Sequence, residues 1–458
     1  MSTNITKKSL NQILEAREER AALRREFCIN ENFSISLNLN IPGIPKNNII
    51  LAAFFDAIVD DLNIYFTAHR LKVLQQKKLN NNAGDFIIFE IQDNNHSNEF
   101  LKNLTENFEQ NHPCGRFIDL DLCDTSGKLV SSGKQKVCFY CNQQAAIICM
   151  LSKNHSFTEL RNFQHKKIVD YLNQSKIKNI ARKISSMAIR SLLYEISLTP
   201  KPGLIDFESN GVHKDMNFRT FIDSTSVLSV YFDELFLSGF LFKNENYSEA
   251  LPEIRILGLQ MEKDMFEATH GVNTQKGIIF LMGITLFSLG ILYQKNKTYS
   301  SEQHQLLIQK ICSNLVINEF QINVNGFETH GEKCFEKYRI GGVRQEVQDG
   351  LPTVFNKALP LLFRHKNLDN NTLYKVLVQI MSKLDDTNIL HRSNMQTLLD
   401  FQKLCKRTLH NFSFSAYNRI IDFCNQKNIS PGGAADLLSI SIFLYMIKKS
   451  EIHLKLHK

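Results

Sequence analysis

The hydrophobic pattern of the chain changes its period near residue 177, and this change restricts the protein to two different kinds of fold. Before it, apolar residues alternate with polar ones in short segments, most clearly in FSISLNLN at 33–40, which predicts a half-buried strand. After it, long helical patterns are separated by loops rich in Gly, Pro, His and Asp. Because 458 residues exceed one ordinary core, we expect a mixed α/β domain over 1–175 and a nearly all-α domain over 176–458.

The first domain is expected to alternate helices and strands. Helices are predicted over 7–27, 47–62 and 98–110, and strands over 33–40, 86–91 and 117–122. The join to the second domain is expected within 163–179, which is polar and basic but lacks the Gly and Ser of a flexible tether.

Composition excludes several classes of protein. Apolar residues form 43% of the chain and charged residues 22%, which is typical of a globular fold. The net charge of +8 without a dense basic run argues against a nucleic-acid partner, although a mild positive field suits phosphorylated substrates or an acidic carrier protein. The polar amino terminus predicts no export signal, so we expect a cytoplasmic protein whose ten cysteines are reduced.

One uncharged apolar segment, GIIFLMGITLFSLGILY at 277–293, raises the question of a membrane span. It has 17 residues, whereas a span needs about 20. It also contains Gly283 and Gly290, which suit close packing against other helices. We therefore expect no membrane partner and interpret the segment as the central buried helix of the second domain.

Polar loops of the second domain gather residue types that do chemistry. They lie at 199–206, 210–216, 269–277, 340–354, 385–392 and 430–438. In GVNTQKG the glycines allow close backbone approach, Lys276 adds charge, and the following helix offers its amide groups to a phosphate. For such a loop in isolation, a Gly-rich helix start with a solvent-exposed lysine is the more common explanation. Arg344, near Glu346, either clamps a phosphate or forms a surface ion pair.

Two further groups in these loops fit a divalent ion held against a triphosphate. Asp385 and Asp386 are adjacent, and His213 stands two residues before Asp215. Mg²⁺ prefers a few carboxylates together with phosphate oxygens. Each group is also explained as an exposed helix cap.

The loops occur in an order that resembles the triphosphoribosyl-dephospho-coenzyme A synthase family over roughly 177–447. The matching stretches are LLYEISLTPKPGLID, NGVHKDM, GVNTQKG, the loop ending in GLPTV, DDTNILHR and SPGGAADLL. The resemblance implies transfer of the triphosphoribosyl part of ATP to the 2′-hydroxyl of 3′-dephospho-coenzyme A, with release of adenine. Such glycosyl transfer needs a base near the attacking hydroxyl and a proton or hydrogen bond for the departing adenine.

The same resemblance suggests roles for residues of these loops. Asp206, Asp215 and Glu346 are candidate bases, and Asp385 and Asp386 are candidates to hold Mg²⁺ or the ribose. Contacts to substrate and phosphate are expected from Lys201, His213, Lys214, Asn273, Lys276, Arg344, Asn388 and Arg392.

The chain departs from the pattern of this family at two positions. His270 stands where a glycine is usual, and Gln275 stands where a histidine is usual. The histidine five positions earlier would replace the lost group only if the loop folds back.

In the first domain, the segment FIDLDL places two carboxylates on one face of a predicted strand. Asp119 and Asp121 point one way, while Ile118 and Leu120 point into the core. Paired carboxylates bind Mg²⁺, which in nucleotidyl transfer neutralises a diphosphate leaving group. The solvent face of an amphipathic strand is the simpler explanation for a lone Asp-x-Asp.

The context of this strand resembles the apo-citrate lyase phosphoribosyl-dephospho-coenzyme A transferase family, across roughly 10–165. The matching stretches are LNLNIPGIPKNN, HPCGRFIDLDL and CFYCNQQAAIICMLSKNH. The resemblance implies a nucleotidyltransferase-like domain that transfers the prosthetic group to a serine of the acyl carrier subunit, with loss of diphosphate. Arg116, Asp119 and Asp121 fall on its central motif and Lys46 on its first, and His112 is expected to contact substrate phosphates with Lys46.

Four residues near the end of the first domain form a possible zinc site. Cys138 and Cys141 are a Cys-x-x-Cys pair, followed by Cys149 and His155. Three buried thiols and an exposed histidine explain the same residues, because the later spacings are not those of a standard finger. Such an ion would stabilise the end of the domain.

The favoured hypothesis is a fusion in which the second domain makes the triphosphoribosyl precursor from ATP and 3′-dephospho-coenzyme A, and the first domain attaches it to the citrate lyase carrier subunit. Two alternatives stay open. The same chemistry would serve malonate decarboxylase, whose carrier subunit bears the same kind of cofactor. A non-catalytic nucleotide- or carrier-binding protein would also account for the departures at His270 and Gln275.

Overall fold

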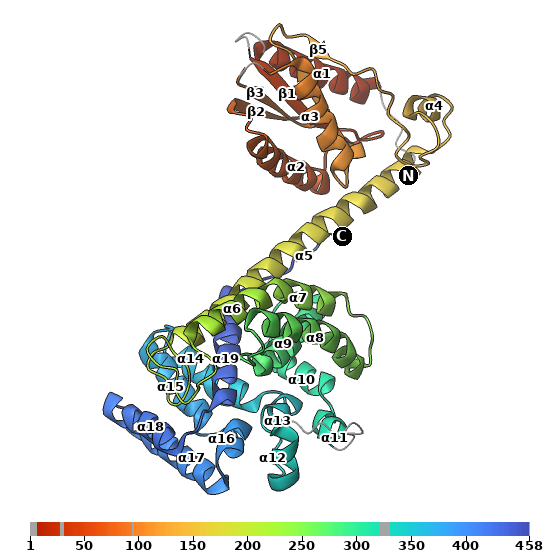
Figure 1. Ribbon diagram of the computed structural model, residues 1–458. Coiled ribbons are helices and arrows are strands. Elements are labelled where there is room, and N and C mark those ends of the chain that lie inside the picture. The colour runs from red at the N-terminus through yellow and green to blue at the C-terminus, as the bar shows by residue number, and fades with distance from the viewer. Residues whose placement is uncertain (1–6, 28–31, 94–95, 321–329, 458) are drawn as a thin grey trace. The chain divides into compact units, whose positions relative to one another are not determined.

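The computed structural model describes residues 7–27, 32–93, 96–320 and 330–457. It divides into two compact units, one formed by the chain up to Lys176 with the last residues from Leu456, the other by Ile177–Lys455 (Figure 1). The first unit contains a sheet with helices, and the second is helical. The expected pairing of a mixed α/β part with a nearly all-α part is confirmed.

The sheet of the first unit has five antiparallel strands in the order β2-β3-β1-β4-β5. They are β1 (Phe33–Leu39), β2 (Val73–Asn81), β3 (Gly84–Ile91), β4 (Ile118–Cys123) and β5 (Leu129–Val130). β1, β3 and β4 lie where the sequence predicts strands. β2 escapes prediction because its sequence, VLQQKKLNN, is mostly polar; it is an edge strand that is largely exposed.

Helices cover both faces of this sheet. They are α1 (Lys7–Phe27), α2 (Ile49–Ala68), α3 (Asn98–Asn111), the 3₁₀ turn Gly115–Phe117, α4 (Ala146–Leu151) and α5 (Phe157–Ser197). On one face Phe54 of α2 joins Ile35 and Leu37 of β1 in the main core. On the other face Leu23 of α1 packs against Phe86 of β3. The alternation of β1 thus separates an apolar face from one that is free to carry polar groups.

The predicted join at 163–179 lies inside α5, which is one unbroken helix. Residues up to Lys176 belong to the first unit and those from Ile177 to the second. The segment contains neither Gly nor Pro, so nothing in its sequence interrupts the backbone ladder.

The second unit is built from helices, and its described residues contain no strand. After α5 these are α6 (Phe218–Leu228), a 3₁₀ turn (Ser229–Tyr231), α7 (Phe232–Leu241), a 3₁₀ turn (Tyr247–Glu249), α8 (Ala250–Ala268), α9 (Lys276–Asn296), α10 (Ser301–Ile311), α11 (Leu315–Phe320), α12 (His330–Tyr338), α13 (Val343–Gln348), a π turn (Val354–Ala358), α14 (Leu359–Arg364), α15 (Asn370–Met381), α16 (Thr387–Arg392), α17 (Met395–His410), α18 (Phe414–Lys427) and α19 (Gly432–Ser450).

α9 is the central helix of this unit. Among the described residues it is long and apolar enough to cross a membrane, but 83% of its apolar window is buried inside the protein. Gly290 lets α9 touch α7 backbone to backbone, since a Cβ there would lie 2.2 Å from the Phe236 carbonyl oxygen. The interpretation of 277–293 as a buried core helix is confirmed.

Candidate active sites

A cavity of about 900 Å³ opens in the second unit, a size that suits a nucleotide. Seven residues predicted to bind substrate line it: Lys201, His213, Asn273, Lys276, Arg344, Asn388 and Arg392. They come from five polar loops that are far apart in the sequence. His213 and Ser430, 217 positions apart, are joined across the cavity wall by a 2.9 Å hydrogen bond between Nε2 and Oγ.

Two long helices begin at the wall of this cavity, α9 at Lys276 and α19 at Gly432. The first turn of a helix has unpaired N–H groups and a partial positive charge, both of which attract anions. Gly277 lets the starts of α9 and α19 approach closely, because a Cβ at that position would lie 2.1 Å from Asp436 Oδ2. The arrangement is suited to holding a chain of phosphate groups.

Cationic side chains at the cavity have acidic partners. Lys276 Nζ lies 2.8 Å from Glu262 Oε2, and Arg255 Nη2 lies 2.6 Å from Glu319 Oε1. Arg344 pairs with the other oxygen of Glu319. Ion pairs with this much solvent contact contribute only about 0–1 kcal/mol, so an entering triphosphate can displace or share them at little cost.

Two carboxyl groups in the cavity wall have a raised affinity for protons. Burial, and then repulsion from Glu195 and Asp386, raises the pKa of Asp436 well above its usual range. Burial also raises the pKa of Glu195, although its ion pair with Lys201 acts in the opposite direction. Asp436 is therefore a group that can donate a proton inside the cavity.

The three predicted bases lie in the polar loops but outside the described wall of the cavity. Asp206 accepts three backbone hydrogen bonds from its own loop, and Glu346 accepts two from Thr353. Asp215 is exposed, as is the predicted phosphate ligand Lys214. None of these four predicted residues is among the described residues that line the cavity. Their roles stay predictions.

The predicted metal pair, Asp385 and Asp386, is engaged in holding the fold together. Asp386 Oδ1 accepts the N–H of Asn388 at 2.9 Å, and Oδ2 accepts the N–H of Ala434 at 3.2 Å. Burial raises the pKa of Asp386 to about 6. Asp385 is exposed and accepts Gln402 Nε2 at 3.0 Å. Because Asp386 joins the starts of α16 and α19, the geometry lends no support to a magnesium ion here.

His213 lines the cavity as a neutral ring. Burial, and then the charge of Arg392, lowers its pKa, while Asp215 opposes the shift from 4.0 Å away. At neutral pH this ring can exchange hydrogen bonds with a ligand, but it adds no positive charge for phosphates.

The two departures from the family pattern have different surroundings. His270 is exposed and has φ of +54°, in the left-handed region that glycine enters without strain. This backbone conformation explains why a glycine is usual at this position. Gln275 is buried beside the cavity, and its Oε1 accepts Ser224 Oγ at 2.5 Å. His270 does not line the cavity among the described residues, so it does not take the place of a histidine at 275.

In the first unit, β4 displays its two carboxylates on the sheet face opposite the main core. Asp119 Oδ2 accepts Asn38 Nδ2 at 3.2 Å, and Asp121 Oδ2 pairs with Arg24 Nη2 at 2.7 Å. Burial, and then repulsion from Asp119, raises the pKa of Asp121, while Arg24 opposes the shift. Two partly desolvated carboxylates of this kind can bind a divalent cation.

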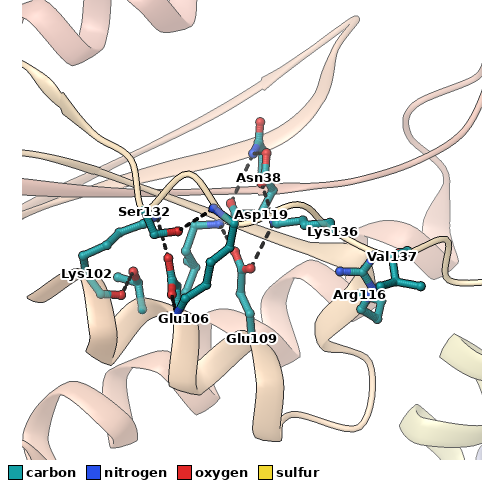
Figure 2. Close-up of polar contacts among 12 residues, drawn as sticks. Asn38, Lys102, Glu106, Glu109, Arg116, Asp119, Ser132, Lys136 and Val137 are labelled. Atoms are coloured by element: carbon teal, nitrogen blue, oxygen red, sulfur yellow. Dashed lines mark hydrogen bonds and ion pairs between the residues drawn. The ribbon is translucent and has the colours of Figure 1, made fainter. Parts of the chain in front are cut away.

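Lys136 links Asp119 to Glu109 of α3 at the edge of β4 (Figure 2). Lys136 Nζ lies 3.1 Å from Asp119 Oδ1 and 3.0 Å from Glu109 Oε2. Glu109 also accepts the N–H of Leu120 at 2.8 Å, and burial raises its pKa. Arg116, just before β4, is exposed and donates to the carbonyl oxygen of Val137.

Lys46 lies within a group of cations. Its pKa falls to about 8, mainly through burial and then through Arg17, Arg161 and Arg20. Like charges converge in this way where phosphates are bound. Lys46 Nζ donates to the carbonyl oxygen of Ile41 at 2.5 Å.

His112, predicted to contact phosphates, is enclosed by side chains. Its Nε2 lies 3.4 Å from Asp61 Oδ2, its ring contacts Tyr171, and its Nδ1 accepts the N–H of Cys114. These contacts fix the end of α3, and a phosphate contact by His112 stays a prediction.

The four predicted zinc ligands come together. The ligand atoms of Cys138, Cys141, Cys149 and His155 all lie within 4.8 Å of one another. Cys138 and Cys149 are buried, whereas Cys141 and His155 are half-buried. A hydrogen bond from the Gln143 backbone is the largest cause that lowers the pKa of Cys141 to about 6, so a thiolate forms readily.

Comparisons with known proteins match both units. Residues 181–453 match the family model of ATP:dephospho-CoA triphosphoribosyl transferase, and residues 8–171 match that of apo-citrate lyase phosphoribosyl-dephospho-CoA transferase. A protein named CitXG from Leuconostoc mesenteroides subsp. cremoris is 33% identical, with 95% of this chain and 96% of that protein aligned. A protein named CitXG from Haemophilus influenzae is 30% identical, with 96% of this chain and 97% of that protein aligned. The chain belongs to the CitXG family.

This chain joins the two matched transferase families, so the protein is a bifunctional transferase of citrate lyase prosthetic-group biosynthesis. Both family resemblances seen in the sequence are confirmed. The synthase half also has relatives that stand alone. A probable 2-(5''-triphosphoribosyl)-3'-dephosphocoenzyme-A synthase from Streptococcus mutans is 34% identical over 58% of this chain and 96% of its own length.

Several residues of this chain are seen to belong to a candidate site only in the structure. Glu195 and Asp436 stand inside the matching stretches LLYEISLTPKPGLID and SPGGAADLL, but only the cavity wall distinguishes them from their neighbours. Arg24 lies in a charged helical stretch without any motif, and Glu109 and Lys136 are single charges in polar segments. The sequence offers no local signal for these three.

Proposed function

We propose that the cavity of the second domain binds ATP with its triphosphate against the starts of α9 and α19. Lys276 and Arg344, at the same wall, then bind phosphate oxygens in place of their present carboxylate partners. The observation that carries this proposal is the convergence of five polar loops on one cavity with two helix N-termini.

In the proposed reaction, the 2′-hydroxyl of 3′-dephospho-coenzyme A attacks the anomeric carbon of the ATP ribose. The bond from that carbon to adenine breaks, a bond to the hydroxyl oxygen forms, and the triphosphate remains on the ribose. Asp436 is the proposed proton donor to adenine, because it lies in the cavity wall and burial raises its pKa, which favours the protonated carboxyl group. The proton that the 2′-hydroxyl loses then reprotonates Asp436.

We propose for the first domain a nucleotidyltransferase-like fold with its site on the outer face of β4. The carrier serine oxygen attacks the phosphorus next to the ribose, the bond to the outer two phosphates breaks, and diphosphate leaves while the serine proton passes to solvent. Asp119 and Asp121 would hold Mg²⁺, which supplies charge neutralisation for the diphosphate. Arg116, beside them, and Lys46 in its cationic group are the proposed phosphate ligands.

Cys138, Cys141, Cys149 and His155 would hold a structural Zn²⁺ at the end of this domain. Three sulfur ligands and one nitrogen ligand that all lie within 4.8 Å of one another form a set that zinc prefers. The use of ATP and dephospho-coenzyme A, with reduced thiols in this cluster, supports a cytoplasmic location.

The proposed protein partner is the acyl carrier subunit of citrate lyase. The match of the first domain to the apo-citrate lyase transferase family supports this partner over the carrier of malonate decarboxylase. Offering both apo carriers to the purified protein with labelled precursor separates the two, and preferential labelling of the malonate decarboxylase carrier would overturn the proposal.

The whole sequence of reactions is tested by mass spectrometry of the apo carrier after incubation with this protein, ATP, 3′-dephospho-coenzyme A and Mg²⁺. We expect the carrier to gain the mass of one phosphoribosyl-dephospho-coenzyme A group, and free adenine to appear. Adenine release that depends on dephospho-coenzyme A, without any gain in carrier mass, would support the synthase and contradict the transferase.

A further inference from the structure

The cysteine cluster has the dimensions and the surroundings of a zinc site. The Sγ atoms of Cys141 and Cys149 lie 3.6 Å apart. A tetrahedral ion with Zn–S bonds of about 2.3 Å places its sulfur ligands about 3.8 Å from one another. Gln144 Nε2 donates to Cys149 Sγ at 3.1 Å, as second-layer donors do when they stabilise a metal-bound thiolate.

The histidine of the cluster supplies an independent observation. Nε2 of His155 is buried and has no hydrogen-bond partner among the described residues. A buried ring nitrogen of this kind is costly unless something binds it. Its neighbours are three sulfur atoms, and coordination to a shared ion would satisfy it.

The segment around the cluster has no regular strand or helix of its own. Between β5 and α4 it is held by the isolated bridge of Val137 with Ala145 and by a few local backbone hydrogen bonds, such as that from the Ala146 N–H to the Lys136 carbonyl at 2.8 Å. The rings of Phe139 and Tyr140 both pack against Phe163. A short segment without regular structure gains order mainly from cross-links, and a metal ion is one.

Two contacts of the transferase site depend on this segment. Lys136, two residues before Cys138, reaches Asp119 and Glu109 with its Nζ. The next carbonyl, that of Val137, receives the side chain of Arg116 (Figure 2). The position of Lys136 at the carboxylates is therefore set by the fold of the segment that contains the cysteines.

We propose that Cys138, Cys141, Cys149 and His155 bind one Zn²⁺, and that this ion acts as a positioning device that keeps Lys136 against Asp119 in the transferase site. The positioning role rests on the proposed function of the first domain, whereas the zinc site itself does not. Lys136 would then be ready to meet the phosphates when the carboxylates take up their cation.

The first test measures zinc in the full chain after dialysis against a chelator of weakly bound ions. We expect one zinc per chain in the unchanged protein and in Cys114→Ser, a buried thiol of the same domain outside the cluster. We expect Cys149→Ser to lose the zinc. A zinc-free unchanged protein, or Cys149→Ser with full zinc, overturns the site.

The second test separates positioning from general stability by a double-mutant cycle. Carrier loading from supplied precursor should fall roughly 10–100-fold in Cys149→Ser, the usual loss when an orienting partner is removed. Lys136→Ala should retain zinc and lose a similar factor, and the double variant should be no worse than either, because both changes remove the same contact. Adenine release should be unchanged in all variants, which shows that the second domain is folded, and the circular dichroism spectrum of each variant should match that of the unchanged protein, which checks the first.

Losses that multiply in the double variant would overturn the positioning role. If the unchanged, zinc-loaded chain releases adenine but loads no carrier, the transferase assignment fails and the positioning role with it. The zinc count is unaffected by that outcome, so the two failures are distinguishable.

Discussion

Two aspartates show how surroundings, rather than residue type, decide what a carboxyl group can do. Asp436 in the synthase cavity and Asp121 on β4 both have a pKa raised by burial. Repulsion from Glu195 and Asp386 adds to the shift at Asp436, which favours a proton donor. At Asp121 the Arg24 cation opposes the shift, which keeps the carboxylate available to a metal ion.

Replacement of Asp121 by Asn tests the transferase site alone. Asp121→Asn should lower carrier loading by roughly 100-fold or more, because a group that stabilises transition-state charge is lost, while adenine release is unchanged. Mass spectrometry of the carrier and chromatography of adenine measure the two activities. Asp60→Asn, at an exposed position of α2, should change neither. Loss of both activities in Asp121→Asn would contradict independent sites.

Replacement of Asp436 by Asn tests the proton donor of the synthase. The amide is similar in shape but has no carboxylic proton, so adenine release should fall roughly 10²–10⁴-fold, the range usual for general acid–base catalysis. Carrier loading from supplied precursor should be unchanged. Full adenine release by Asp436→Asn would assign the proton transfer to another group.

Among the elements, the contact between α9 and α10 links folding to pH. His304 of α10 is fully buried, and its Nε2 lies 2.8 Å from Ser288 Oγ of α9. Burial lowers the pKa of His304 to about 3, although a backbone hydrogen bond at Thr285 opposes the shift. The folded protein thus binds this proton less readily than the unfolded chain, whose histidines have a pKa of about 6.5.

The sign of the pH effect follows from this difference. Stability from a neutral His304 is present above about pH 6.5 and is lost as pH falls toward 3, by about 2 kcal/mol between pH 7 and pH 5. Urea unfolding followed by circular dichroism should show that His304→Gln has a weaker pH dependence than the unchanged protein by this amount. His410→Gln, at an exposed position of α17, should not alter the dependence. Equal pH dependence in His304→Gln would refute the assignment.

For the whole molecule, the relation of the two activities is the main question. The Streptococcus mutans synthase aligns over 96% of its length with the second part of this chain only. A relative of the synthase half therefore stands as a chain of its own, and we expect the precursor made by this protein to be able to leave the chain as well.

Mixing two inactive chains tests this exchange. Asp121→Asn still makes the precursor and Asp436→Asn still transfers it, so neither alone should load the carrier from ATP and dephospho-coenzyme A. Together they should do so, at a rate that rises with their concentrations. Failure of the mixture, with each remaining half-activity intact, would mean that the intermediate does not leave the chain.

The sequence by itself determined the two kinds of fold, the two families and most elements of the sheet, because hydrophobic periodicity and sequence motifs are both contained within short segments of the chain. It placed Asp119 and Asp121 on one face by strand alternation, and it predicted the cysteines and histidine as ligands. The sequence did not predict β2, because an exposed edge strand needs no apolar pattern.

Only the tertiary structure decided which polar residues meet. Gly277 and Asp436 are far apart in the chain yet share one wall, and Lys136 reaches Asp119 from a segment without regular structure. The hydrogen bonds that Asp206 and Glu346 accept within their own loops are likewise visible only in the structure, and their roles as bases stay predictions. The physical reason is that burial, repulsion and hydrogen bonding depend on neighbours brought together by folding, and local spacing carries no information about them.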